Sequence, residues 1–168
     1  TILLLFIITI CNAQFNLKTK IPVDSLVKIG KLSNGLTYYI RKNSKPENKA
    51  ELRLVVNAGS VLEKDNQQGL AHFMEHMNFN GLKNFPKNDL ENYLQTIGVK
   101  FGADLNASTS FDETIYILPL PSDKQSKVDS GFMILSDWAH NATFDTAEIR
   151  KERGLVLEES RLDKNASS

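Results

Sequence analysis

The chain has 168 residues, enough for one domain to bury a substantial core without disulfides. Lysine plus arginine equal aspartate plus glutamate at 20 each, and no long run of one sign occurs, so nucleic acid and anionic membranes are not indicated as partners. The single cysteine, Cys11, excludes a disulfide framework within the chain.

The first ten residues are apolar apart from two threonines, and Cys11-Asn12-Ala13 follows. This pattern predicts a signal peptide over residues 1–13, with its start missing, then a polar linker over 14–25. The mature protein is then exported, to the periplasm or outside the cell, without membrane contact. A lipoprotein acylated at Cys11 is disfavoured by the bulky Ile10 before it, and a frayed apolar terminus or membrane anchor stays an alternative.

Two β-rich segments, residues 26–32 and 36–40, flank Ser33-Asn34-Gly35. Asn-Gly between such segments predicts a hairpin, because both residues tolerate positive φ. Residues 50–56 alternate apolar and polar side chains, which predicts a third strand with one buried face.

The rest of the chain predicts alternating helical and extended segments. Helices are expected at residues 69–77, 88–97, 124–141 and 146–162, the last one capped by Asp145 or Thr146. Residues 100–110 and 111–120 predict a second hairpin-like pair of strands, which the prolines at 119 and 121 are expected to break.

His72 and His76 are four residues apart, and Glu75 lies between them. On a helix the two imidazoles lie about 40° apart on one face, where they can grip one metal ion. Zinc suits imidazole, and a catalytic zinc site takes three protein ligands and a water, so one ligand is missing. Glu75 could be that ligand or the general base of the His-x-x-Glu-His signature. Alternatively, the histidines merely pack or face solvent.

The last predicted helix contains Glu152 and Glu159, seven residues apart. Two helical turns bring them within about 20° of one face, whereas Glu158 points about 100° away from Glu159. Their separation along the axis is roughly 10 Å, so one of them can bind an ion and the other can only support it. The structural alternative is a solvated acidic helix.

Three motifs occur in order: GLAHFMEHMNFNG at residues 69–81, LNASTS at 105–110 and ERGLVLEE at 152–159. Together they resemble the inverzincin zinc peptidases, which include pitrilysin, insulin-degrading enzyme and the mitochondrial processing peptidase β subunit, and most of all the exported bacterial branch. The resemblance implies an α+β, processing-peptidase-like metallohydrolase fold, a two-layer domain of mostly antiparallel sheet with helices packed on one face. It also implies a catalytic domain over residues 26–168, incomplete at its C-terminus.

By this resemblance His72, His76 and Glu159 bind one Zn²⁺, Glu75 is the base and Glu152 is a supporting carboxylate. A second homologous half, downstream in the same chain or in a separate subunit, is expected to complete the enzyme. The isolated segment is therefore expected to be inactive on its own.

Asn106 and Ala107 match the strand that pairs with an extended substrate in this family. An ordinary sheet strand with a structural asparagine is the alternative. His140, the remaining histidine, is expected to be structural rather than a ligand.

The resulting hypothesis is a zinc-dependent endopeptidase that hydrolyses peptides or unfolded segments through metal-activated water and a glutamate base. A non-catalytic chamber or assembly subunit of a peptidase complex is the alternative, and the intact His-x-x-Glu-His motif favours the enzyme. A zinc-storing or purely structural site is disfavoured because it would have no need of Glu75.

Overall fold

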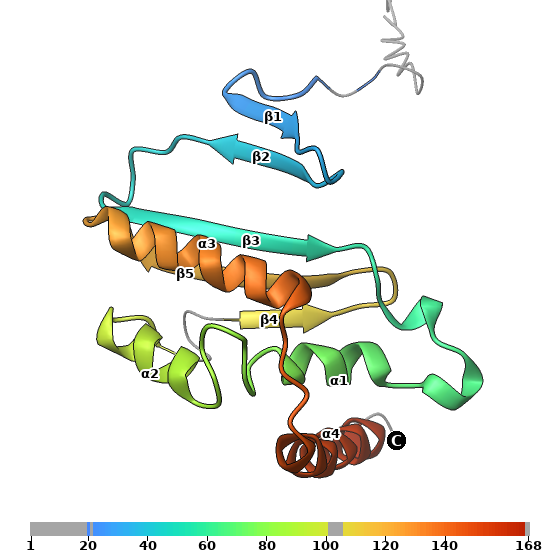
Figure 1. Ribbon diagram of the computed structural model, residues 1–168. Coiled ribbons are helices and arrows are strands. Elements are labelled where there is room, and N and C mark those ends of the chain that lie inside the picture. Colours follow the sequence, from blue (N-terminus) through green and yellow to red (C-terminus); the bar gives the residue numbers. More distant parts are fainter. Residues whose placement is uncertain (1–19, 21, 101–105, 167–168) are drawn as a thin grey trace, which may run out of the picture. The chain divides into compact units, whose positions relative to one another are not determined.

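A computed structural model describes residue 20, residues 22–100 and residues 106–166 of the chain (Figure 1). The predicted signal peptide, with Cys11, lies outside the described residues. Two compact units are divided between Ser44 and Lys45. No helix of the described part is both long and apolar enough to cross a membrane. The elements are, in order, β1 (Val27–Lys31), β2 (Thr37–Arg41), β3 (Lys49–Val56), η1 (Ser60–Leu62), η2 (Asp65–Gln67), α1 (Leu70–Met77), α2 (Asp89–Thr96), β4 (Asn106–Thr109), β5 (Thr114–Pro121), α3 (Gln125–His140) and α4 (Thr146–Ala166).

The described part of the first unit contains the predicted hairpin. Strands β1 and β2 pair antiparallel from Val27 opposite Arg41 to Lys31 opposite Thr37. Gly35 has a φ of 93°, which a side chain would disfavour, and the Asn34 side chain accepts a hydrogen bond from the Leu36 N–H at 3.1 Å. The Asn-Gly signal therefore predicted this turn correctly.

The second unit is built on an antiparallel sheet with the strand order β3-β5-β4. Alternate residues of β5, from Thr114 to Leu120, are buried, so one face of this strand is covered. Helix α3 lies along β3 and β5, as Figure 1 shows. The buried core joins this face to α2 and α3 through Leu82, Leu90, Leu94, Val99, Tyr116, Leu118, Leu120, Ile134 and Trp138. The expected α+β architecture, with an antiparallel sheet and helices, is confirmed.

Strand β5 includes Pro119 and ends at Pro121, one residue beyond the end predicted from the sequence. Pro119 pairs with Glu51 and Pro121 pairs with Lys49. Strand β4 is described as pairing with β5 only between Thr114 and Ile117. The two prolines lie beyond that stretch, where a missing N–H removes no hydrogen bond of the described β4–β5 ladder.

Helix α1 is attached to the sheet and to α3 at its C-terminal end. The buried Asn78 side chain donates hydrogen bonds to the Tyr116 hydroxyl at 2.7 Å and to the Trp138 carbonyl at 3.3 Å. In return, the Trp138 indole N–H donates to the Asn78 carbonyl at 3.1 Å. Burial raises the pKa of Tyr116 to about 12, and the nearby Glu75 carboxylate acts in the same direction. These contacts set the position of α1 against β5.

The fully buried Asp137 carboxylate organises the segment that follows α1. It accepts hydrogen bonds from the Asn84 backbone N–H at 2.9 Å, from the Asn84 side-chain amide at 2.9 and 3.1 Å, and from the Asn141 side-chain amide at 2.9 Å. A buried charge needs such donors, because each replaces part of the lost hydration. Asp137 therefore joins the end of α3 to the loop before α2.

We expect Asp137→Ala to lower the free energy of unfolding by about 2–4 kcal/mol, because it leaves the N–H donors of Asn84 and Asn141 without their acceptor. The control is Asp129→Ala on the same helix, where an exposed carboxylate contacts the Gln125 side chain. Its effect should stay within about 0.5 kcal/mol. Chemical denaturation of both variants measures the difference, and equal losses would contradict the assigned role of Asp137.

Candidate metal centre

Helix α1 carries both histidines and begins at a turn that only glycine adopts easily. Gly69 has a φ of 86°, in the left-handed region. The Glu63 carboxylate accepts hydrogen bonds from the Gly69 N–H at 2.8 Å and from the Ala71 N–H at 2.7 Å. A carboxylate at this end satisfies free N–H groups and complements the helix dipole. The start of α1 is thereby determined.

Helix α4 brings the carboxylates and packs against α1. The Asp145 side chain accepts hydrogen bonds from the Ala147 N–H at 2.8 Å and from the Glu148 N–H at 3.2 Å. Of the two predicted capping residues, Asp145 is therefore the one whose side chain caps the helix. Figure 1 shows α4 next to α1, on the side of α1 away from the sheet.

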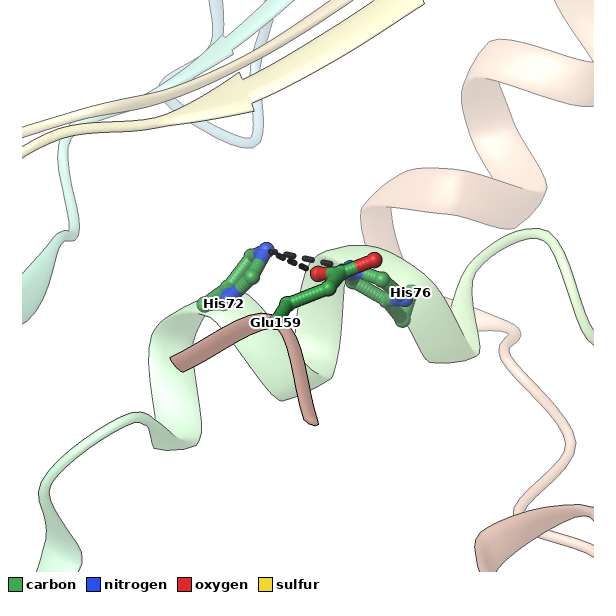
Figure 2. A group of neighbouring side chains, drawn as sticks. All are labelled: His72, His76 and Glu159. Atoms are coloured by element: carbon green, nitrogen blue, oxygen red, sulfur yellow. Dashed lines mark hydrogen bonds and ion pairs between the residues drawn. The ribbon is translucent and has the colours of Figure 1, made fainter. Parts of the chain in front are cut away.

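His72, His76 and Glu159 converge at the contact between α1 and α4 (Figure 2). The two imidazole Nε2 atoms are 3.0 Å apart. The Glu159 Oε2 atom lies 3.7 Å from Nε2 of His72 and 3.5 Å from Nε2 of His76. The rings meet edge to face at an interplanar angle of 84°. One donor atom from each of the three residues lies within 4.8 Å of the other two.

These three donor atoms fit a tetrahedral zinc ion. Zinc bonds to imidazole nitrogen and carboxylate oxygen are about 2.0–2.2 Å long, so adjacent ligand atoms of a tetrahedron lie about 3.3–3.5 Å apart. The three observed separations, 3.0, 3.5 and 3.7 Å, lie around this value. Two nitrogens and one oxygen are also a typical donor set of a catalytic zinc site with an open fourth position. The residues present therefore fit zinc.

Glu152 contacts the opposite nitrogen of the His76 ring. Its Oε1 lies 2.7 Å from Nδ1 of His76, and its side chain is only 8% exposed, against 50% for Glu159. The contact is a hydrogen bond in the tautomer with the proton on Nδ1, and in that tautomer the lone pair of Nε2 faces His72 and Glu159. The position of Glu152 therefore favours the tautomer of His76 that a metal ligand needs.

The remaining predicted residues occupy separate positions. Glu75 lies outside the cluster of donor atoms, and its Oε2 accepts a hydrogen bond from the Thr109 hydroxyl at 2.5 Å. Glu158 forms an exposed ion pair with Arg161 at 3.2 Å. His140 ends α3 and is not one of the converging donors found among the described residues.

Strand β4 carries Asn106 and Ala107 and lies beside α1. It pairs with β5 on one side, and in the described residues no strand occupies its other side. Asn106 is exposed, whereas Ala107 packs against the core. This edge leaves backbone groups available to an added strand.

Two site contacts were missed by the sequence analysis. Thr109 belongs to the LNASTS motif and is two residues from Ala107, so its place on the same strand face could have been inferred. Glu63 gave no comparable signal, because it precedes Gly69 by six residues, outside the spacing of a local helix cap.

Comparison with known proteins identifies related sequences and folds. The family model described as Insulinase (Peptidase family M16) matches residues 38–166. The probable zinc protease PqqL of Haemophilus influenzae is 42% identical over 160 residues, which are 95% of this chain and 17% of that protein. The first half of the periplasmic protease PqqL from Escherichia coli matches with 40% identity and a TM-score of 0.81, over 86% of this chain and 31% of that one.

The structure of the periplasmic protease PqqL from Escherichia coli also matches, with 40% identity and a TM-score of 0.80, over 85% of this chain and 16% of that one. The chain thus spans about one sixth of the length of this relative and of the Haemophilus protein. Because the family match covers most of the chain, and the fold and three sequence motifs agree with it, the chain belongs to the insulinase family of peptidases, peptidase family M16.

Proposed function

We propose that this chain is the catalytic segment of a zinc-dependent endopeptidase that hydrolyses peptides or unfolded protein segments. The convergence of His72, His76 and Glu159 is the observation that carries the proposal. Two further features support it: the Glu75 carboxylate on α1, the helix of the two histidines, and the open edge of β4 beside that helix. The names of the PqqL relatives, a probable zinc protease and a periplasmic protease, agree with this chemistry.

Peptide hydrolysis needs an electrophile, a base and a bound substrate. Zinc held by the three ligands would supply Lewis-acid polarisation of the scissile carbonyl and of a water molecule. Glu75 takes one proton from the attacking water as its oxygen bonds to the carbonyl carbon. The same carboxylate then returns the proton to the peptide nitrogen as the C–N bond breaks. One water is consumed, and a new carboxyl group and a new amine are released.

Glu152 and β4 contribute without touching the reacting atoms. Glu152 holds the Nδ1 proton of His76, which keeps the Nε2 lone pair available for the metal. The outer edge of β4, at Asn106 and Ala107, would pair with the extended backbone of the substrate. Backbone pairing makes little demand on substrate sequence, which suits peptides and unfolded segments as the substrate class.

The cellular setting and the partners are part of the same proposal. The apolar start of the chain and the periplasmic PqqL match support an exported protein. Because one matching structure is the first half of PqqL, a second homologous half is expected to complete the enzyme. Cleavage is therefore best measured with the complete protein rather than with these residues alone.

Zinc affinity separates the roles of Glu152, Glu158 and Glu159 on α4. Glu159→Gln should weaken binding by more than about 100-fold, because a neutral amide replaces an anionic ligand, whereas Glu152→Gln should cost about 10- to 100-fold. Glu158→Gln is the matched control, since its carboxylate pairs with Arg161, and it should leave affinity unchanged. Competition with a chelator at one pH measures all three variants. A larger loss for Glu152→Gln would reassign the third ligand.

Cleavage of an unstructured peptide tests the base. Glu75→Gln in the complete protein should keep its zinc and lose about 10²- to 10⁴-fold or more in kcat, because the amide cannot accept the proton. Zinc content is measured by elemental analysis of the same sample. Loss of zinc would make Glu75 a ligand, and undiminished cleavage would remove it from the mechanism. A wild-type protein that binds zinc without cleaving any peptide would favour the non-catalytic subunit instead.

A further inference from the structure

The proposed base is tied to a strand distant in sequence. The Thr109 hydroxyl at the end of β4 donates a hydrogen bond to Oε2 of Glu75, with an oxygen–oxygen distance of 2.5 Å. Hydrogen bonds between a hydroxyl and a carboxylate at such distances are among the stronger ones in proteins. The contact is partly buried and joins residues 34 positions apart in the chain.

Thr109, the donor of this hydrogen bond, is itself fixed by backbone pairing within the sheet. Thr109 pairs with Thr114 of β5, and the adjoining turn is closed by a hydrogen bond from the Ser110 N–H to the Glu113 carbonyl at 2.8 Å. Thr109 is also β-branched, so its χ1 angle has few alternatives.

The free Glu75 side chain would have several rotamers, and a general base needs a single one. The hydrogen bond at Oε2 restricts the rotation of the carboxylate. Among the described residues, Thr109 is the only hydrogen-bond partner of this carboxylate, so Oε1 is left to exchange the proton. Displacement of a catalytic group by about 1 Å can cost about 10²-fold in rate. The Thr109 contact is therefore placed where it would affect turnover rather than substrate binding.

We propose that Thr109 is a positioning residue that holds the Glu75 carboxylate in a fixed position relative to β4, the strand that would bind the substrate. This proposal rests on the proposed function, because it assigns a role relative to that base. Strand β4 then has two tasks. Its outer edge would align the scissile bond of the substrate, and Thr109 at its end aligns the base. Both alignments then depend on one rigid strand.

The test compares Thr109→Val with Thr109→Ser in the complete protein, using cleavage of an unstructured peptide. Valine keeps the branched shape and strand preference of threonine and replaces the hydroxyl with a methyl group, which cannot donate a hydrogen bond. We expect kcat to fall about 10- to 100-fold in the valine variant, with KM and zinc content unchanged. Serine keeps a donor at the same position and should restore most of the wild-type kcat.

Thr114→Val is the matched control, because it removes a threonine hydroxyl that bonds to Ala58 in the same hairpin and does not contact Glu75. It should lower thermal stability and leave kcat unchanged. If Thr109→Val does not fold, Thr109→Ala is measured in its place. A crystal structure of the zinc-free variant adds a readout independent of activity, and it should show Glu75 in a different rotamer or in several.

Two results would overturn the proposal: an unchanged kcat in Thr109→Val, whether or not KM rises, or an equal loss of kcat in Thr109→Ser. If the wild-type protein cleaves and Glu75→Gln does not, either of these rejects the role of Thr109 alone. If the wild-type protein does not cleave, the proposed function fails and the role of Thr109 fails with it.

Discussion

The geometry of the candidate metal centre depends on how His76 is held. Its Nδ1 atom is 2.7 Å from the buried Glu152 carboxylate, while its Nε2 atom faces His72 and the half-exposed Glu159. One imidazole is thus contacted by two carboxylates from the same helix, each at a different nitrogen. This arrangement requires α4 to lie along α1 in one rotational and axial setting, because a shift of one residue would turn both carboxylates about 100° away.

The difference in burial between the two carboxylates agrees with the different roles proposed for them. Glu152 can be buried because the imidazole N–H compensates for part of its lost hydration. Glu159 is more exposed, which leaves the cluster accessible to solvent. On its other side, α1 is fixed to β5 and α3 by the hydrogen bonds of Asn78 with Tyr116 and Trp138. The helix that presents the histidines is therefore constrained by α4 on one side and by the sheet on the other.

Elements with strong local signals were predicted well. The hairpin at Asn34-Gly35 and the helices α2 and α3 lie within one or two residues of expectation, because turn chemistry and apolar periodicity act over a few residues. The C-terminal end of the strand at residues 111–120 was also predicted to within one residue, although Pro119 lies inside the strand. Whether a proline interrupts a strand depends on which neighbour lies beside its missing N–H, and that neighbour is distant in sequence.

The same distinction applies to the site. Helical periodicity alone was sufficient to put His72 and His76 on one face of α1, and Glu152 and Glu159 on one face of α4. Each pair lies within a single helix, so its spacing is a local property of the sequence. Packing between α1 and α4 selected which carboxylate approaches which nitrogen, because helix periodicity gives both glutamates nearly the same direction. Packing of β4 against α1 likewise brought Thr109 to Glu75. Contacts of this kind depend on the relative position of whole elements, and no local pattern of residues encodes that position.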